Sequence, residues 1–500
     1  MAVVDSGRPG GPPYPPLARG PVLAAMGTLA VVLTVLSNGY GFHRDELYFR
    51  MLEPGWGYVD QGPLTPMLVR FFSQHVADEP WAIRIPATAS TVVSVLVVVL
   101  ITRELGGGRA AQALCAWAYA FAATPLLFGH VMLTSSLDLV VWPLVSLAII
   151  RAVLRPDPRW WLAAGVVVGL SMYNKLLVAM LLMALACGIA LVGPRRLLVS
   201  PWVLGSGVLA LAIGAPNVVY QASQHWPELE MGQALAENNG GDVRALMWPF
   251  LLILLGPPLT AVWGAGLVAL WRRPSWRPVR FVAAGFPVLL VLVFVAGTQL
   301  YYPYGYLVVL FAAGCVPAGE LVERSSPWRA VLVVGVSVNA LVSAVIALPL
   351  IPVAGVGSTP VIAVNQTAGD AVGWPTYVQQ IADVYDGLPA PDADGAVVIT
   401  SNYGEAGAVT RYGPDLGLPG VFSAQNQLYF QARPPDDTRV VVLVGGQLPA
   451  ARGLFATCAV RARLDSGVDV DNEEQGQPVA VCRDPTADWV SVWAALQHYD

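Results

Sequence analysis

Lysine is almost absent from this chain of 500 residues: Lys175 is the only one, and the other 27 of its 28 basic residues are arginines. Charged residues of both signs make up only 12% of the sequence, about half of the roughly 25% usual in soluble domains. Hydrophobic residues make up 55%, and the mean hydropathy is +0.58. This composition predicts a polytopic membrane protein rather than a soluble enzyme with a single anchor.

Several signatures of other protein classes are missing as well. The sequence has no glycine-rich phosphate-binding loop, no Cys/His metal cluster and no nucleotide fingerprint, which argues against an enzyme that depends on ATP or NAD. No internal repeat is evident, so the inverted-repeat sign of many transporters is absent. No basic patch in the C-terminal part suggests nucleic acid as a partner.

Long apolar runs occupy most of the first two thirds of the chain. A bilayer needs roughly 20 apolar residues per helix. We therefore predict about eleven transmembrane helices, near residues 20–38, 84–102, 110–129, 136–153, 160–174, 176–193, 202–220, 246–271, 279–298, 304–322 and 330–351. The fifth and sixth are short and could be one interrupted segment.

Arginines in every second loop indicate the orientation of these spans. The basic loops carry Arg103 and Arg109; Arg151, Arg155 and Arg159; Arg195 and Arg196; Arg272, Arg273, Arg277 and Arg280; and Arg324 and Arg329. Basic loops stay in the cytoplasm, so the alternate loops and the C-terminus are expected outside. The sequence thus predicts a multi-pass protein of the plasma (cell) membrane with a cytoplasmic N-terminus.

Composition divides the chain into three parts. Residues 1–19 are rich in Pro and Gly, are expected to be disordered and lack the shape of a cleavable signal peptide. Residues 20–351 form the predicted transmembrane domain, with an outer loop at 39–83. Residues 352–500 hold most of the acidic residues and are expected to form an extracytoplasmic α/β domain.

The C-terminal part shows short β-like runs and helical patterns. The runs are 396–400, 439–445 and 479–482, and the helical patterns lie at 374–386, 404–412 and 487–497. Cys458 and Cys482 also lie here, and we predict that they form a disulfide if the domain faces an oxidising compartment.

The first outer loop places carboxylates beside the membrane, in "FHRDELYFRMLEPGWGYVDQGPLTP". Asp45 and Glu46 could be solvated loop acids that end the first span. However, "LYFRML" is an amphipathic helical pattern, and the stretch around Asp60 leads into a second one. A carboxylate at such an interface is a candidate general base, since partial desolvation tends to raise its pKa.

The order of these features resembles the GT-C glycosyltransferases, most closely the branch of protein O-mannosyltransferases and the bacterial aminoarabinose transferase of lipid A. The shared pattern is an outer "DE" after the first span, then "GY-x-D-x-x-P-L", then a lone Asp after the third span. "GLSMYNKLLV", "NYGEAGAVTRYGPDLGLP" and "CRDPTADWVSVWAALQHYD" extend the likeness over most of the chain.

The resemblance implies transfer of a sugar from a polyprenyl monophosphate lipid to an acceptor at the outer membrane face, with inversion. Asp45 then matches the catalytic base, and Glu46 is a supporting neighbour. Asp60 matches a second essential carboxylate, which is a metal ligand in some members. Asp138 matches the acid of the second outer loop; its alternative is a helix N-cap after two serines.

Positive charge or hydrogen-bond donors must meet the phosphate of such a donor lipid. Lys175 is the first candidate, because a cation at membrane depth is costly and usually functional; its alternative is a lysine snorkelling to the interface. The other candidates are Tyr58, Tyr301, Tyr302 and Arg84, each with an aromatic belt or a plain anchor as its alternative. His225 could join Asp60 at a divalent metal ion, or be a solvated histidine.

Three positions depart from the family pattern. Gly62 replaces the first of two prolines, and Gln61 and Gln299 replace basic residues. These departures put donor choice and phosphate binding in doubt. Two other functions stay open: a transporter or lipid flippase, and a non-catalytic cell-envelope assembly protein. The sugar, and whether the acceptor is a glycan, a lipid or a protein, are left undetermined.

Overall fold

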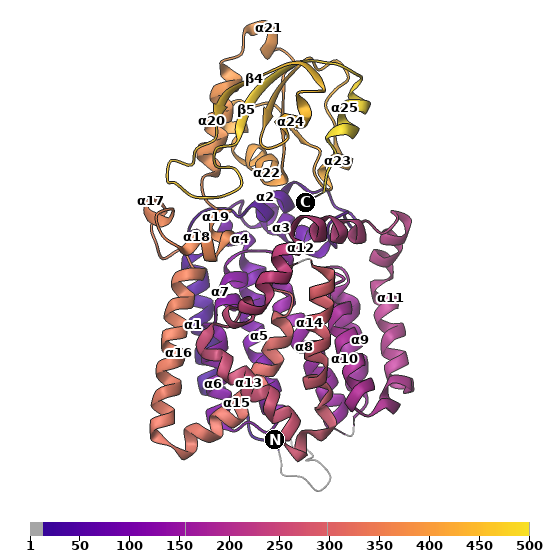
Figure 1. Cartoon of the computed structure of the whole chain (residues 1–500), viewed down its shortest axis with the longest axis vertical. Coiled ribbons are helices and arrows are strands. Elements are labelled where there is room, and N and C mark those ends of the chain that lie inside the picture. Colours follow the sequence, from indigo (N-terminus) through magenta and orange to yellow (C-terminus); the bar gives the residue numbers. More distant parts are fainter. Residues whose placement is uncertain (1–13, 156, 298, 500) are drawn as a thin grey trace. The chain divides into compact units, whose positions relative to one another are not determined.

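The computed structural model describes residues 14–155, 157–297 and 299–499, and the chain forms two compact units (Figure 1). The first, here called the helical unit, comprises Met1–Val35, Ile85–His130 and Thr134–Ala347. The second, here called the mixed unit, comprises Leu36–Arg84, Val131–Leu133 and Leu348–Asp500. The expected outer loop and the C-terminal part therefore fold together.

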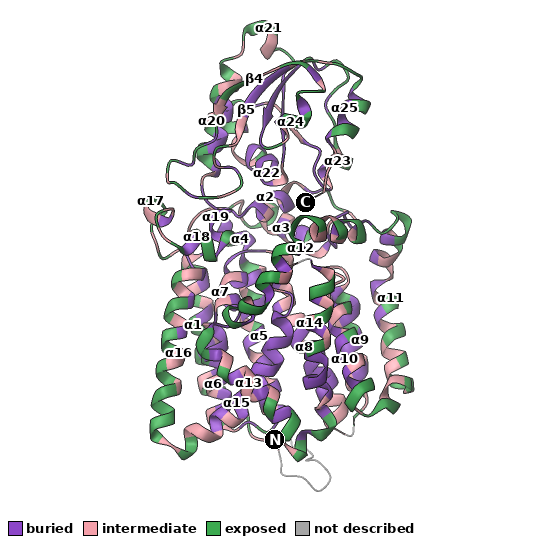
Figure 2. Cartoon of the chain, viewed as in Figure 1, coloured by how far each residue is buried: buried purple, intermediate pink, exposed green. Residues whose placement is uncertain are grey.

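Apolar helices build the helical unit. They are α1 (Arg19–Leu36), α5 (Ile85–Glu104), α6 (Arg109–Ala120), α7 (Ala123–His130), α8 (Thr134–Leu154), α9 (Arg159–Ser171), α10 (Val178–Val192), α11 (Pro201–Ser223), α12 (Pro227–Ile253), α13 (Pro257–Arg272), α14 (Phe281–Ala296), α15 (Tyr304–Arg324) and α16 (Ser326–Ala347), with short 3₁₀ turns η1 (Arg195–Val199) and η2 (Pro274–Val279). Figure 2 shows much exposed surface on α11 and α16. By contrast, two thirds of the residues in the most apolar stretch of α15 are buried. Apolar side chains that stay exposed on outer helices are those expected to face lipid.

Each of the eleven predicted spans coincides with a helix or a bent helix pair, but the count of eleven is not confirmed. Within the described residues, six helices are long and apolar enough to cross a membrane, or up to eight if each bent pair is one span. The remaining three, α9, α10 and α14, have 13, 15 and 16 residues. At 1.5 Å per residue they reach about 20–24 Å, short of a hydrocarbon core of about 30 Å.

The break between α12 and α13 has a local cause. Gly256 has φ +98°, which favours glycine, and Pro257 and Pro258 follow it at the start of α13. The two helices meet at 92°. The expected straight span at 246–271 is therefore bent.

The expected disorder of residues 1–19 does not extend to the last of them. Residues 1–13 lie outside the described part of the chain, but the backbone N–H of Ala18 donates to Gln112 Oε1 at 2.9 Å. Arg103 donates to the carbonyl of Pro15 at 2.7 Å, and Arg155 lies over the ring of Tyr14. These contacts fix residues 14–18 on the helical unit.

A five-stranded sheet forms the core of the mixed unit, in the order β2-β1-β3-β5-β4. The strands are β1 (Val397–Thr400), β2 (Val421–Ser423), β3 (Val440–Val444), β4 (Phe455–Arg463) and β5 (Pro478–Pro485). The pairs β2–β1 and β1–β3 are parallel, and β3–β5 and β5–β4 are antiparallel. Three of the strands, β1, β3 and β5, match the predicted runs, while β2 and β4 were missed.

Both faces of this sheet are covered by apolar clusters. Neighbouring residues of a strand point to opposite sides, so each central strand contributes to both clusters. Val441, Leu443 and Cys482 pack in one cluster with Trp489 and Trp493 of α25 (Trp489–Leu496). The other face places Val440 and Val481 against residues that follow or end α20 (Trp374–Asp386). Cys458 pairs with Cys482 across β4 and β5, so the predicted disulfide is confirmed.

Further short helices complete the mixed unit: α2 (Arg44–Met51), α3 (Leu64–His75), α4 (Pro80–Ile83), α17 (Val353–Val356), α18 (Val361–Val364), α19 (Gln366–Gly369), α21 (Ala390–Ala393), α22 (Tyr403–Tyr412), η3 (Pro414–Leu416), α23 (Leu428–Gln431) and α24 (Leu448–Ala451). Helices α2 and α22 approach closely at Gly407. A Cβ added there would come within 2.6 Å of the backbone of Leu47. This close packing brings the start of α22 to the acids of α2.

Candidate functional site

Adjacent acids at the start of α2 have opposite environments. Glu46 is fully buried, and its carboxylate accepts from the backbone N–H groups of His43 and Met132 at 2.9 Å each. The side chain of Asp45 stays 28% exposed. The capping box formed by His43 and Glu46 turns the two side chains apart, so Asp45 is the accessible acid of the pair.

Arg84 forms a buried, two-pronged ion pair with Glu46. Its Nε and Nη2 donate to the two carboxylate oxygens at 2.8 and 2.9 Å, and it also donates to the carbonyls of Ser37 and Gly41. Only 1% of Arg84 is exposed. This geometry favours a structural role over the predicted phosphate contact, because the guanidinium offers no surface to a ligand.

Tyr403, the first residue of α22, donates a hydrogen bond from its hydroxyl to Asp45 Oδ1 at 3.0 Å. His43 Nδ1 lies 3.9 Å from the same oxygen. Arg44 lies over the Tyr403 ring at 4.7 Å from its centroid and pairs with Glu473. Asp45 is thus oriented by a residue that the sequence places 358 positions away.

Asp60 is the second carboxylate of this site. Burial raises its pKa to about 7; a hydrogen bond from Tyr48 opposes this, and the nearby charge of Asp45 adds to it. Its Oδ1 has no hydrogen-bond partner among the described residues. Asp60 therefore exchanges a proton near neutral pH, unlike an ordinary surface aspartate.

Two tyrosines in ring contact connect the acids, with their ring planes tilted by 32°. The rings of Tyr48 and Tyr403 lie 4.6 Å apart, with Tyr48 bonded to Asp60 and Tyr403 to Asp45. Burial raises the pKa of both phenols well above the usual value, so both remain hydrogen-bond donors. Sequence reasoning missed both residues, although "DELYFRML" and "NYGEAGAV" contain them. Nothing in the sequence signals that the two stretches meet.

A second group of predicted residues meets in the helical unit. A small pocket is lined by Asp138, Tyr301 and Tyr302, and the ammonium of Lys175 lies 5.1 Å from the centroid of the Tyr302 ring. Asp138 and Lys175 interact electrostatically, and Asp138 Oδ2 has no hydrogen-bond partner among the described residues. The N-cap alternative for Asp138 is wrong, because α8 already begins at Thr134.

The other two predicted residues are not brought into these groups. The hydroxyl of Tyr58 donates to the carbonyl of Glu53 at 2.6 Å, which uses the donor expected for a phosphate. His225 is exposed at the end of α11, in the helical unit, while Asp60 belongs to the mixed unit. Across the part of the chain that the structure describes, no three His, Cys, Asp or Glu side chains gather as a metal site.

The fold is that of the GT-C membrane glycosyltransferases. The chain is similar to ArnT from Cupriavidus metallidurans in the apo state, with 14% identity, a TM-score of 0.60 and coverage of 92% of this chain and 97% of that one. The match to ArnT bound to undecaprenyl phosphate has 16% identity, the same TM-score and the same coverage. A match to the arabinofuranosyltransferase AftD from Mycobacteria has 13% identity and a TM-score of 0.52, and covers 94% of this chain and 40% of that one.

One family model also matches in sequence. Residues 60–220 match the family described as dolichyl-phosphate-mannose-protein mannosyltransferase. No protein of curated function matches the chain. The resemblance and the fold class predicted from the sequence are confirmed by these findings: a helical, multi-pass membrane protein of GT-C type with a C-terminal sheet domain.

Proposed function

We propose that this protein is a glycosyltransferase that moves a sugar from a polyprenyl-phosphate-linked donor to an acceptor on the outer membrane face. The observation that carries the proposal is the pair Asp45 and Asp60, held by two tyrosines in ring contact on an ArnT-like fold. The acceptor is a cell-envelope glycan, a lipid or a protein. The family match and the undecaprenyl phosphate bound to ArnT support a lipid-linked donor.

The reaction we propose is a single displacement with inversion. An acceptor hydroxyl oxygen attacks the anomeric carbon, the bond from that carbon to the phosphate oxygen breaks, and polyprenyl phosphate leaves. Asp45 takes the hydroxyl proton, since it is the accessible acid and Tyr403 fixes one of its oxygens. Its other oxygen is left to accept that proton.

Asp60 supports this step from a buried position. Its carboxyl group, whose pKa is raised to about 7, interacts electrostatically with Asp45 and helps to position the sugar or acceptor hydroxyl. If the reaction uses a divalent ion, Asp45 and Asp60 suit the mode in which one or two carboxylates and substrate phosphate oxygens share the metal. Such an ion would neutralise the leaving phosphate.

In the helical unit, Lys175 is the residue we propose to bind the donor phosphate. Tyr301 and Tyr302 surround it, and Asp138 balances its charge when no lipid is bound. A buried cation of this kind offers a phosphate a charge-assisted contact in a medium of low dielectric constant. The absence of basic residues at Gln61 and Gln299 leaves this role to Lys175.

The test is to supply purified protein in lipid nanodiscs with several radiolabelled polyprenyl-phosphate sugars and a membrane extract as acceptor source. We expect one donor to lose its sugar and the product to have inverted anomeric configuration. Turnover of none of the donors, by protein that stays folded and still binds polyprenyl phosphate, would contradict the proposal. An Asp45→Asn sample provides the background.

A further inference from the structure

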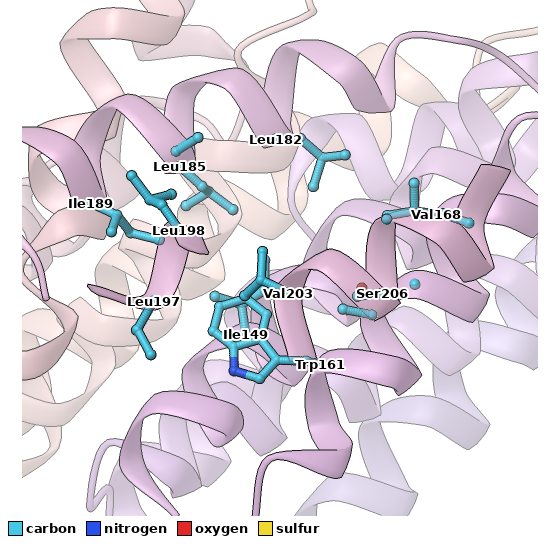
Figure 3. A pocket seen from close by; sticks show the side chains of 15 residues that line it. Ile149, Trp161, Val168, Leu182, Leu185, Ile189, Leu197, Leu198, Val203 and Ser206 are labelled. Carbon is cyan, nitrogen blue, oxygen red and sulfur yellow. The ribbon is translucent and has the colours of Figure 1, made fainter. Parts of the chain in front are cut away.

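An apolar cavity lies within the helical unit, away from the residues discussed so far (Figure 3). Its volume is about 220 Å³. The lining side chains come from α8, α9, α10, η1 and α11, and they include Trp161, Val168, Leu185, Leu198 and Val203. Ser206 contributes the only side-chain hydroxyl among the lining residues. A cavity of this composition suits a hydrocarbon chain.

Exposed arginines lie at one end of this cavity. Arg195 and Arg196 directly precede Leu197 and Leu198 of η1, which line it, and Arg159 precedes the lining Trp161 by two residues. The Nε of Arg195 donates to the carbonyl of Ala190, at the end of α10. Among the described residues, none of the three side chains forms an ion pair. Asp157 lies in the same turn as Arg159 and receives a hydrogen bond from its backbone N–H.

We propose that this cavity binds an anionic phospholipid, with one acyl chain inside it and the headgroup phosphate at Arg195 and Arg196. The three arginines belong to loops predicted to face the cytoplasm, where anionic lipids attract basic residues at helix ends. Basic pockets between transmembrane helices are the usual binding sites for such headgroups. One lipid molecule then matches both features: its phosphate meets the arginines, and its acyl chain fills the apolar cavity.

The donor lipid of the proposed reaction fits this site poorly. Lys175 follows α9 at its C-terminal end, whereas Arg159 is the first residue of α9. The 13 residues of the helix separate the two ends by about 20 Å. One phosphate cannot contact both ends, so the arginines need a different anion. This exclusion of the donor lipid rests on the proposed role of Lys175, whereas phospholipid binding itself does not require sugar transfer.

Gly207 offers a way to close the cavity without straining the fold. It lies in the lining, on α11, and a Cβ added to it would meet no atom within 4 Å. Gly207→Phe therefore adds a bulky side chain at the wall of the cavity while the arginines remain. Gly264→Phe, at an equally open position on α13 outside the cavity, is the matched control.

A second variant, Arg195→Gln/Arg196→Gln, here called the rim variant, removes the two positive charges next to the cavity. Its control is Arg272→Gln/Arg277→Gln, which removes two exposed arginines from another loop predicted to face the cytoplasm. The readout is native mass spectrometry of full-length protein released from nanodiscs of phosphatidylglycerol and phosphatidylcholine. Thermal unfolding of each variant reports whether it remains folded.

We expect the protein to retain phosphatidylglycerol in preference to phosphatidylcholine. Each arginine near an anionic headgroup is worth roughly a fivefold change in affinity, so the rim variant should bind about 25-fold more weakly. Gly207→Phe should lose the lipid as well, while both controls keep it. Equal retention of both lipids by all variants would overturn the proposal.

Two further outcomes would also overturn it. Loss of phosphatidylglycerol in the rim variant but not in Gly207→Phe means that the arginines bind headgroups without the cavity. One-for-one displacement of phosphatidylglycerol by polyprenyl phosphate, with polyprenyl phosphate lost in the rim variant, assigns the cavity to the donor lipid instead.

Discussion

The hydroxyl of Tyr403 donates to the carboxylate of Asp45 at 3.0 Å, although 358 residues separate the two in sequence. The contact lies inside the mixed unit, where α22 meets α2 at Gly407. A C-terminal segment thereby supplies a direct partner to the acid that we propose as the base. In the mechanism that we propose, the sheet domain therefore contributes to the site.

Asp45→Asn should reduce sugar transfer by about 10²- to 10⁴-fold, because Asn keeps the size of Asp but cannot accept a proton near neutral pH. Turnover of a radiolabelled donor measures the loss, and binding of polyprenyl phosphate should be unchanged. Asp415→Asn, which changes an exposed acid of the same unit, serves as control. Near-normal turnover by folded Asp45→Asn would remove Asp45 from the mechanism.

Tyr403→Phe should lower turnover by about tenfold while substrate binding changes little. The variant keeps the ring between Arg44 and Tyr48 but removes the hydrogen bond to Asp45, and a bond to a charged group is worth about 1.5–3 kcal/mol. Tyr412→Phe, on the same helix, is the matched control. An equal effect of the two substitutions would show that Tyr403 acts only through packing.

Glu46→Gln should destabilise the protein rather than alter the chemistry. The substitution leaves Arg84 as a buried charge without its counterion, and breaking a buried pair typically costs 3–5 kcal/mol. Thermal unfolding in detergent should show a clear drop, with the exposed Glu53→Gln as control. A fully stable but inactive Glu46→Gln would instead assign Glu46 to catalysis.

Asp60 should make the stability of the mixed unit depend on pH. Its pKa is raised to about 7 in the folded protein and is about 3.9 in the unfolded chain, so the folded state holds the extra proton between these values. The contribution of protonated Asp60 to the free energy of unfolding is therefore fully present below about pH 4, and it is lost as the pH rises to about 7. Asp60→Asn should gain stability relative to the unchanged protein over this range, and a pH-independent difference would contradict the assignment.

The topology predicts where added cysteines react. A cysteine at Ala450, exposed in the mixed unit, should react with an impermeant maleimide on intact cells, while one at Arg277 should react only after permeabilisation. The control is the unchanged chain, in which Cys115 and Cys315 are buried and Cys187 is half-buried, so its labelling sets the background. The reverse pattern would place the proposed site in the cytoplasm and exclude a donor on the outer face.

Much of the fold was predictable because the signals are local. Apolar length placed a helix or a bent helix pair at each predicted span, although the count of eleven membrane spans is not confirmed, and β-branched runs located β1, β3 and β5. The disulfide followed from two cysteines in one polar domain. The edge strands β2 and β4 escaped prediction because β2 has only three residues and much of β4 is exposed, so neither carries a clear pattern.

The sequence by itself determined the class of protein and the acids worth testing, since membrane burial constrains composition and motif order survives in the linear chain. The family resemblance already ranked Asp45 above Glu46, but only the tertiary structure showed the physical difference between them, a capping box and the buried Arg84. It also joined Tyr403 to Asp45 and Tyr48 to Asp60. Such contacts depend on how segments that are distant in sequence pack together. The residues next to a side chain in sequence do not specify these contacts.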